Sequence, residues 1–552
     1  MVFTIRKSPI GWTSILIAVI ASCGGFLFGY DTGQISNVTV FDDFKIRFAT
    51  GALDASGIPT WNPWLEGLIV GFLSIGTAIG CILGAPTADK LGRRLAMSVE
   101  CVVFTIGVII QVTSFQAWYQ VAIGRLVTGL GVGALSSAVP LYQSETVPRQ
   151  VRGALVATYQ LFITFGILIA YAFGIGTRTL QPSSATWRLL IALGIAFAAI
   201  LGFGIQFCPE SPRWLAARGR YEEAYKSLAR VRAASADSGN PWVEQEYADI
   251  LAAVEQDKQL GESSWIECFY PHHRTLYRTL LGIALQAGQQ LTGANYFFYF
   301  GTSIFTAASI SDPFLSQLIL GAVNFVCTFG GLYILERFGR RRPLIFGAAW
   351  MVIWLCVFAA AGVGGDPTQY GIACLQIVAA CFFIVGYATT WAPGIWLFVG
   401  ETFSLRTRAK QASLATLSNW AWNFCIGFFT RPIVTSIQFK YGFVFAGANA
   451  LNFLVAYFFV YETEKLTLEQ IDEMYNSDTP ARKSTSWVPA GYSSRYEVKD
   501  EEKKGEELAQ MSDTKPEWRS KPDDKGDETD TTRKAPHTVA VTAETTQKNS
   551  DE

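Results

Sequence analysis

Hydrophobic and polar positions divide the chain into long apolar blocks separated by short polar stretches. A helix needs about 20 mostly apolar residues to cross a membrane, and twelve blocks approach that length. Twelve membrane-spanning helices are therefore predicted, at roughly Thr13–Ser36, Leu65–Ala88, Leu95–Ser114, Trp118–Gln143, Gly153–Gly176, Arg188–Cys208, Leu280–Ala307, Phe314–Leu335, Leu344–Gly364, Tyr370–Val399, Ala412–Ile437 and Phe443–Tyr461. The first block is too long for a signal peptide and has no small-residue cleavage site, so it is predicted to be retained.

Every second loop between the predicted spans is rich in Lys and Arg, whereas the loops between them contain few of these residues. Because basic loops stay in the cytoplasm, these loops and both termini are predicted to be cytoplasmic, including residues 1–12. A linker over residues 209–279 joins the sixth and seventh spans, and helical spacing at Tyr221–Val231 predicts short surface helices there. The polar tail, residues 463–552, is predicted to be cytoplasmic and largely disordered past about Tyr475.

Composition agrees with a polytopic membrane protein. Of the 552 residues, 50% are hydrophobic and 16% are charged, whereas soluble domains carry about 25% charged residues. The net charge of -1 provides no broad basic field for nucleic acid. The ten Cys residues show no CxxC spacing and the three His residues lie outside the apolar blocks, so no metal site is expected. No nucleophile–base arrangement or Walker lysine is present, so neither an enzyme nor a cofactor is expected.

The two halves of the chain repeat one another. The segment Gly84-Ala-Pro-Thr-Ala-Asp-Lys-Leu-Gly-Arg-Arg94 has a second copy at Gly331-Leu-Tyr-Ile-Leu-Glu-Arg-Phe-Gly-Arg-Arg341. Glu145 and Arg152 recur as Glu401 and Arg408, and Glu210 recurs as Glu462, all at a similar offset. A duplicated six-helix unit is therefore predicted, with halves at residues 13–208 and 280–462. Two such halves around a central cavity are typical of transporters.

The repeated charges lie at the predicted cytoplasmic mouth, where Arg and Glu of neighbouring helices can pair. One interpretation is that these pairs hold an inner gate closed and break when it opens. The other is that they record only the positive-inside rule and charged helix ends, which accounts for the Arg but not for the repeated Glu residues. The candidate gate residues are Asp89, Arg93, Arg94, Glu145, Arg152, Glu210, Arg213, Glu336, Arg340, Arg341, Glu401 and Arg408.

Several longer motifs accompany the two Gly-Arg-Arg loops. They are Phe28-Gly-Tyr-Asp31, Gly124-Arg125, Pro209-Glu-Ser-Pro-Arg-Trp-Leu215, Gln289-Gln-Leu-Thr-Gly-Ala-Asn295, Thr390-Trp-Ala-Pro393 and Ser418-Asn-Trp-Ala-Trp-Asn423. With these motifs the chain resembles the sugar porter family of the major facilitator superfamily from about Phe26 to Asp472, and it is most similar to fungal hexose transporters. The resemblance implies an all-α membrane protein of twelve helices in two pseudo-symmetric six-helix halves with a cytoplasmic helical loop domain. It also implies hexose transport across the plasma membrane by alternating access.

Two positions depart from the family pattern. The family has Pro-Glu-Thr-Lys-Gly after the last span, whereas this chain has Tyr461-Glu-Thr-Glu-Lys465, which places the C-terminal gate contact in doubt. Ala388 stands where animal glucose carriers have Glu, so one inner-gate pair is expected to be absent or replaced.

Amide side chains inside the spans are the candidates for binding a neutral sugar. An amide offers both a donor and an acceptor to hydroxyl groups, and polar residues at membrane depth normally face a cavity or the bundle interior. The resemblance assigns the sugar to Gln160, Gln289, Gln290, Asn295, Asn324 and Asn419, with Phe28, Trp396 and Trp420 offering flat apolar faces. The alternative is that the amides only join neighbouring helices; for the grouped Gln289, Gln290 and Asn295, sugar binding is favoured.

Asp31 is the carboxylate identified inside a span, and the family pattern places Arg125 opposite it. Loss of a proton lets Asp31 pair with Arg125 and gain of a proton releases it, so this pair predicts proton symport. Facilitated diffusion is the alternative, because fungal facilitators carry the same Asp. A non-transporting sugar sensor is a further alternative, although the tail suits phosphorylation by kinases and ubiquitin-driven turnover better than signalling.

Overall fold

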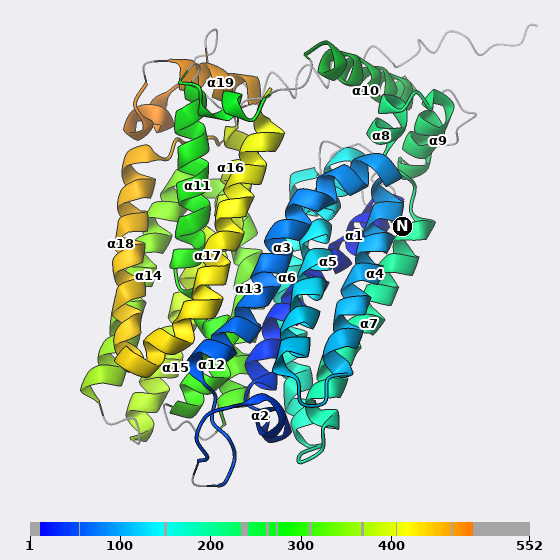
Figure 1. The fold of residues 1–552 in the computed structure, drawn as a ribbon. Helices are drawn as coiled ribbons and strands as arrows, with labels where there is room; N and C mark the ends of the chain where they lie inside the picture. The colour runs from blue at the N-terminus through cyan, green and yellow to red at the C-terminus, as the bar shows by residue number, and fades with distance from the viewer. Residues whose placement is uncertain are drawn as a thin grey trace, which may run out of the picture. The chain divides into compact units, whose positions relative to one another are not determined.

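The computed structural model describes residues 12–54, 56–147, 152–232, 241–260, 264–271, 274–307, 312–365, 369–403, 406–464, 466, 468–477 and 479–489. These residues lie within one compact unit that runs from Met1 to Arg495. Long helices make up most of this unit (Figure 1), as the apolar blocks predict. The predicted all-α membrane fold is confirmed.

Six long helices form the N-terminal half. They are α1 (Trp12–Val38), α3 (Pro63–Leu91), α4 (Arg93–Val112), α5 (Trp118–Thr146), α6 (Arg152–Arg178) and α7 (Ala185–Gly204). The closest neighbours are α3 with α5 and α1 with α6. Glycines permit this approach, because a Cβ added to Gly133 of α5 would lie 2.1 Å from the Thr77 carbonyl oxygen of α3. Such packing through small residues is typical of helices in membranes.

The C-terminal half repeats this plan with two of its spans interrupted. It contains α11 (Thr275–Leu291), α12 (Ala294–Ala307), α13 (Pro313–Phe338), α14 (Arg341–Gly364), α15 (Tyr370–Gly386), a π-helical segment (Tyr387–Trp391), α16 (Ala392–Thr402), α17 (Arg408–Ile437) and α18 (Tyr441–Phe459). The π-helical segment and α16 continue α15 through the predicted tenth span.

Twelve spans account for these helices. Among the described residues, ten helical segments are long and apolar enough to cross a membrane. The last segment, Lys410–Phe459, is 50 residues long and contains both α17 and α18. The seventh span is not among these ten segments, because α11 and α12, with 17 and 14 residues, are each too short to cross a membrane alone. The prediction of twelve spans in two halves is therefore confirmed.

The seventh span is broken, and the prediction of one continuous helix over Leu280–Ala307 is wrong at this point. Gly293 separates α11 from α12 with φ of +91°, a conformation that only glycine adopts at low cost. A Cβ at this position would also lie 2.7 Å from the ring of Phe445 on α18. Apolar composition continues through the break, so the hydrophobic pattern carried no sign of it.

The two halves meet along two pairs of helices, α3 with α17 and α6 with α13, and α1 also contacts α12. Two ion pairs join them, Arg178 with Asp312 at 3.0 Å and Glu66 with Arg431 at 2.6 Å. Both pairs lie at the ends of their helices where α2 (Asp42–Phe48) is found, opposite the linker (Figure 1). We call this the α2 end, and the opposite end the linker end.

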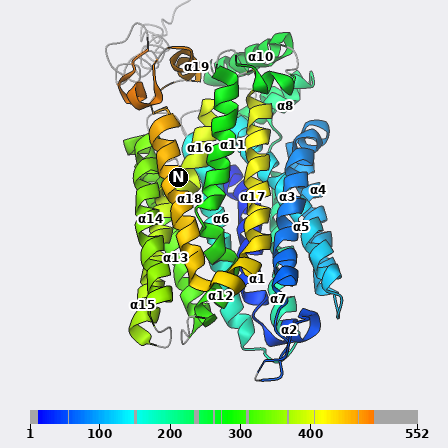
Figure 2. The ribbon, with the colours of Figure 1, turned by 60° about the vertical axis from the view of Figure 1, so that its left-hand side comes forward.

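The linker and the first part of the tail both lie at the linker end (Figure 2). The linker contains α8 (Pro212–Ala217), α9 (Tyr221–Val231) and α10 (Pro241–Leu260), and α9 has the predicted bounds. A backbone N–H and the guanidinium of Arg406, whose Nε lies 2.9 Å from the carboxylate, hold the pKa of Glu267 below its usual range.

The tail contributes a helix, α19 (Leu468–Asn476), and a short 3₁₀ helix, η6 (Ala481–Ser486). The guanidinium of Arg278, at the start of α11, pairs with Asp472 of α19 and lies 4.3 Å from the Tyr475 ring centre. The described part of the tail thus extends past Tyr475 to residue 489. Residues 490–552, which the sequence predicts to be disordered, lie outside the described residues, as do residues 1–11.

We predict that Gly293→Ala lowers the free energy of unfolding by about 1–3 kcal/mol, the cost of a residue held in a sparsely populated backbone conformation. Gly447→Ala in α18 is the matched control, because no atom lies within 4 Å of an added Cβ there. Thermal unfolding of the purified protein in detergent measures both. Equal unfolding midpoints for the two variants would contradict this account of the break.

Candidate functional site

The break in the seventh span brings amide side chains from both of its sides together. Asn295 in the first turn of α12 donates from Nδ2 to Oε1 of Gln290 near the end of α11, at 2.6 Å. The Thr292 hydroxyl donates to the Gln289 carbonyl oxygen at 2.7 Å and so satisfies one of the carbonyl groups freed by the break. The interruption therefore holds the Gln290 and Asn295 amides against each other.

Helix α17 completes this amide network. Asn419 accepts from Nε2 of Gln290 at 2.9 Å and donates to Oε1 of Gln289 at 2.8 Å. It also donates to Oε1 of Gln286 at 2.7 Å, one helical turn before Gln290 on α11. The structure thus brings together the predicted residues Gln289, Gln290, Asn295 and Asn419. Gln286 was missed, although its spacing of four residues from Gln290 on one helix face could have revealed it.

Gln289 and Gln290 use their amides differently. Gln289 donates from Nε2 to the carbonyl oxygens of Trp391 and Ala392, at 3.1 and 3.0 Å, where the π-helical segment meets α16. Its donors and its acceptor are therefore engaged within the C-terminal half, as the helix-joining alternative expects. Gln290 instead shares its Oε1 between Asn295 and the Asn423 amide, the latter at 3.3 Å.

Asn423 extends the network to the other half. Its Oδ1 accepts from the Ser74 hydroxyl of α3 at 2.6 Å and from the Tyr299 hydroxyl of α12 at 2.8 Å. Beside it, the rings of Phe28 on α1 and Trp420 on α17 lie 5.3 Å apart between centres at an angle of 61°. The polar network and this aromatic pair therefore lie together where α1 and α3 face α12 and α17.

Two polar atoms near the middle of the spans keep unused hydrogen-bonding capacity. The indole Nε1 of Trp420 is buried without a hydrogen-bond partner among the described residues, and it lies near the sulfur of Cys81, a weak acceptor. Oδ1 of Asn324 on α13 is buried and accepts no hydrogen bond from the described residues. A buried polar group without a partner costs free energy, so both atoms are candidates for contact with a bound polar molecule.

The remaining predicted site residues stay outside the network's hydrogen bonds. Gln160 is half-buried on α6, and Asn324 is buried on α13. Trp396 on α16 keeps 38% of its surface exposed, unlike Trp420 with 2%. Phe28 and Trp420 therefore lie together, whereas Trp396 is not part of this aromatic pair.

Asp31 and Arg125 face each other inside the N-terminal half, with relative exposures of 0% each. The shortest distance between them, from Oδ2 to Nη1, is 3.7 Å, which is too long for a hydrogen bond. Gln34 donates to the other carboxylate oxygen at 2.7 Å. The nitrogens of the Arg125 guanidinium find no hydrogen-bond partner among the described residues. The pair is thus a close electrostatic contact whose hydrogen bonds are not made.

Glu100 is a second buried carboxyl that the sequence reading missed. It lies on α4 with 3% exposure, and both of its oxygens lack a hydrogen-bond partner in the described residues. An unpaired charge in such a place is expensive, so this carboxyl is expected to be neutral. One acidic residue inside an otherwise apolar block, eight positions after Gly92, was the available signal.

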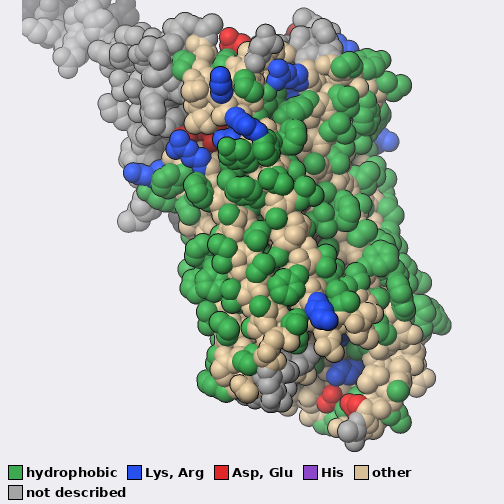
Figure 3. Space-filling view, turned by 90° about the vertical axis from the view of Figure 1, so that its left-hand side faces the viewer, with side chains coloured by type: hydrophobic (Ala, Val, Ile, Leu, Met, Phe, Trp, Pro, Cys, Tyr) green, Lys and Arg blue, Asp and Glu red, His purple; other side chains and the backbone are tan. Residues whose placement is uncertain are grey.

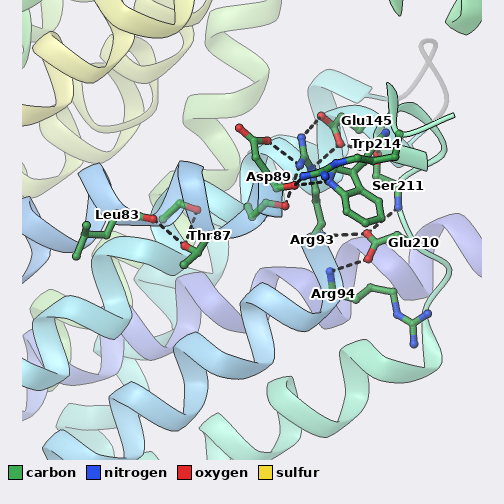
Figure 4. Close-up of polar contacts among 12 residues, drawn as sticks. Leu83, Thr87, Asp89, Arg93, Arg94, Glu145, Glu210, Ser211 and Trp214 are labelled. Atoms are coloured by element: carbon green, nitrogen blue, oxygen red, sulfur yellow. Dashed lines mark hydrogen bonds and ion pairs between the residues drawn. The ribbon is translucent and has the colours of Figure 1, made fainter. Parts of the chain in front are cut away.

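A compact charge cluster lies at the linker end of the N-terminal half (Figure 4). Arg93 at the start of α4 donates from Nε and Nη2 to the two carboxylate oxygens of Glu145 at the end of α5, at 3.0 and 2.9 Å. It also pairs with Asp89 at 2.9 Å. Glu210 accepts from the backbone N–H groups of Arg93 and Arg94, at 3.1 and 3.3 Å, and so caps α4.

The C-terminal half contains the same arrangement. Arg340 donates to both carboxylate oxygens of Glu401, at 3.1 and 2.7 Å. Glu462 accepts from the backbone N–H groups of Arg340 and Arg341, at 2.9 and 3.1 Å, and so caps α14. The departure from the family pattern at residues 461–465 therefore does not remove this contact, because the cap requires only the Glu462 carboxylate.

Further contacts follow the repeat. The second Arg of each loop donates to a carbonyl oxygen near the end of the sixth helix of its half, Arg94 to Gln206 and Arg341 to Tyr457. The hydroxyl after each capping Glu donates to the paired Glu, Ser211 to Glu145 at 2.5 Å and Thr463 to Glu401 at 2.6 Å. These contacts join neighbouring helices within one half.

Four predicted gate residues lie apart from these contacts or cannot be placed. Glu336 is exposed and forms no ion pair with a described residue, in contrast to its counterpart Asp89. Arg213 is exposed on α8, and Arg408 donates to the Gly400 carbonyl oxygen. The side chain of Arg152 lies outside the described residues. Ala388 is buried in the π-helical segment and brings no charge to the linker end.

Comparison with known proteins gives a consistent result. The family model described as "Sugar (and other) transporter" matches residues 17–475. The high-affinity fructose transporter ght6 of Schizosaccharomyces pombe is 43% identical over 474 residues, covering 84% of this chain and 87% of the relative. The low-affinity glucose transporter HXT3 of Saccharomyces cerevisiae is 42% identical over 484 residues, covering 86% and 84%.

Solved structures resemble the fold. The proton:xylose symporter XylE bound to 6-bromo-6-deoxy-D-glucose, a major facilitator superfamily protein, has a TM-score of 0.69 at 24% identity and covers 84% of this chain and 99% of that chain. A partially occluded inward-open form of XylE from E. coli has a TM-score of 0.68 at 23% identity, covering 82% and 99%. At this level of identity the likeness extends to the fold alone.

We predict that Arg340→Gln and Glu401→Gln each lower the thermal unfolding midpoint and that the double variant falls little further. Residues in one network couple by about 0.5–3 kcal/mol, and this pair is largely buried, with side-chain exposures of 15% and 21%. Arg220 and Glu223, with exposures of 51% and 54%, are the control pair, for which the coupling should be close to zero. Additive losses for Arg340 and Glu401 would show that the ion pair does not hold α14 to α16.

Proposed function

The chain belongs to the sugar transporter family, and from this premise we propose that it carries a hexose across the plasma membrane by alternating access. The observation that carries the proposal is the amide network centred on Gln290 and Asn419, which lies where the two halves face each other. A neutral sugar needs donors and acceptors in equal measure, and carboxamides supply both without the cost of burying a charge.

We assign the hexose to the edge of the network that reaches the other half. Gln290, Asn295 and Asn423 present amides there, and the unpaired Trp420 indole N–H and Asn324 Oδ1 supply one more donor and acceptor. Phe28 and Trp420 offer apolar faces to the C–H side of a sugar ring. Gln289 holds the π-helical segment in place and acts as a positioning residue. A few hydrogen bonds of about 0.5–1.5 kcal/mol each suit micromolar to millimolar affinity.

The contacts between the halves support alternating access. Arg178–Asp312 and Glu66–Arg431 close the halves together at the α2 end. The charge clusters at the linker end instead lie within each half, so they keep each half rigid while the halves tilt. We propose that the linker end faces the cytoplasm, since it carries the basic loops. In this state the α2 end is shut, and outward opening requires the two ion pairs to break.

Proton symport is the favoured mode of energy coupling. Protonation of Asp31 would weaken its attraction to Arg125, and deprotonation would draw the two together. The charges of Asp31 and Arg125 both act on the Tyr299 hydroxyl. This hydroxyl donates a hydrogen bond to Asn423 of the amide network. The ion pair therefore acts electrostatically on a residue that contacts the sugar-binding edge. Facilitated diffusion is the runner-up, and regulation of the tail by kinases and ubiquitin remains a further proposal.

We predict that Gln290→Ala raises the hexose KM about tenfold, the loss expected for one or two hydrogen bonds. Uptake by a cell that lacks its own hexose carriers measures the KM, with surface abundance determined in parallel. Gln376→Ala is the matched control, because Gln376 is also buried in the same half but lies on α15, away from the network. An unchanged KM for Gln290→Ala would remove Gln290 from the site.

We predict that Asp31→Asn abolishes accumulation of hexose against its gradient while exchange continues. In the wild type, a potential of 100 mV with one pH unit could drive roughly 500-fold accumulation. Glu100→Gln, which alters another buried carboxyl of the same half, should keep accumulation. Sealed vesicles with an imposed proton gradient provide the measurement. Absence of sugar-induced proton uptake by the wild type would favour facilitated diffusion instead.

A further inference from the structure

A group of basic side chains surrounds the linker end of α18. The guanidinium of Arg482 on η6 lies 4.1 Å from the ring centre of Phe458 and 5.3 Å from that of Tyr457. The guanidinium of Arg341 lies 5.6 Å from the same Tyr457 ring. Arg342 follows Arg341, and Lys483 follows Arg482. We call these four basic residues the α18 patch.

Positive charge in the α18 patch exceeds the negative charge that the protein supplies. Arg342, Arg482 and Lys483 are exposed, and none of their side chains forms an ion pair or hydrogen bond with another described residue. Arg341 is 9% exposed, and its Nε is buried without a hydrogen-bond partner. The charge of Glu462 acts favourably on Arg341, whereas the charges of Arg482 and Arg342 act unfavourably on it. Glu462, the nearby carboxylate, already accepts from the backbone N–H groups that it caps.

The two halves differ at this place. In the N-terminal half, Arg94 donates to the Gln206 carbonyl oxygen, and Arg230 donates to that of Phe207 at 3.0 Å. In the C-terminal half, Arg341 makes the matching bond to Tyr457, whereas Arg482 only stacks on aromatic rings. The donors of Arg482 therefore remain available for a ligand.

The α18 patch borders the apolar surface of the spans. Tyr457, Phe458 and Phe459 are 40%, 40% and 49% exposed, and the next exposed residues along α18 are Leu454 and Leu451. Figure 3 shows Lys and Arg side chains gathered at one end of this face, beside a broad area of hydrophobic side chains. Aromatic and basic residues together are typical of the level at which lipid headgroups lie.

We propose that the α18 patch binds the headgroup of an anionic phospholipid of the inner leaflet. Guanidinium groups recognise phosphate oxygens by paired hydrogen bonds, and the acyl chains would lie along the exposed Leu and Phe side chains of α18. The inner leaflet carries the anionic lipids of a cell membrane. This step rests on the proposed orientation of the linker end, but not on sugar transport.

The test uses the full-length purified protein in nanodiscs with phosphatidylserine in both leaflets, so binding does not depend on orientation. Native mass spectrometry counts the retained lipids against a phosphatidylcholine background. Replacing two basic residues in Arg482→Gln/Lys483→Gln should weaken phosphatidylserine retention about 30-fold. Lys440→Gln, at the opposite end of α18, is the matched control and should retain it as the wild type does.

Several results would overturn the proposal. Equal phosphatidylserine retention by the double variant and the wild type would place the lipid elsewhere. Full displacement by millimolar inorganic phosphate would identify a site for free phosphate rather than for a lipid. A zero-length cross-link from Lys483 to an acidic residue of 496–552 in these nanodiscs would make the chain's own tail the occupant. Absence of transport by the wild type, with phosphatidylserine retained as predicted, would leave the proposal intact and count against the transport assignment alone.

Discussion

The absence of water inside a bilayer is the constraint on which this structure depends. A polar group placed among the spans must find its partner within the protein, or it remains at a cost of several kcal/mol. The break at Gly293 frees backbone groups, and the Thr292 hydroxyl donates to the Gln289 carbonyl oxygen and accepts from the Ala294 N–H. The π-helical segment exposes carbonyl oxygens, and Gln289 donates to them. We therefore expect the functional site where polar side chains are grouped among the spans and where some of them lack a hydrogen-bond partner.

The satisfied and unsatisfied polar groups are distributed unequally. At the linker end, each capping Glu and each Arg–Glu pair is fully engaged within its own half. Near the middle of the spans, the Arg125 guanidinium, the Asn324 carbonyl oxygen and the Trp420 indole N–H lack full partners. This distribution fits two rigid halves with a substrate bound between them. The Arg–Glu pairs and the capping Glu residues form their hydrogen bonds within one half, whereas polar atoms between the halves keep unused hydrogen-bonding capacity.

Much of the fold could be predicted from the sequence because membrane spans and repeats leave strong signals. Twelve apolar blocks and a repeat near 250 residues give the two halves, and the Arg93–Glu145 and Arg340–Glu401 pairs follow from it. The break at Gly293 could not be predicted, because both sides of it are apolar and the cause lies in the Phe445 ring of a distant helix. The α14 cap survives an altered motif, because one carboxylate suffices for it.

Only part of the candidate site could be predicted from the sequence. Grouped amides near residues 289–295 pointed to Gln290 and Asn295, but the role of Gln289 depends on the π-helical segment, which composition does not reveal. Gln286 and Glu100 are single polar residues inside apolar blocks, and the hydrophobic pattern alone does not assign them a role.

The most direct test of hexose transport is counterflow by the purified wild-type protein. Vesicles are preloaded with unlabelled D-glucose and diluted into labelled D-glucose without a proton gradient. The account predicts a transient overshoot of labelled sugar inside the vesicles, because one carrier exchanges both pools. Equilibration without an overshoot, at the rate of protein-free vesicles, would contradict it.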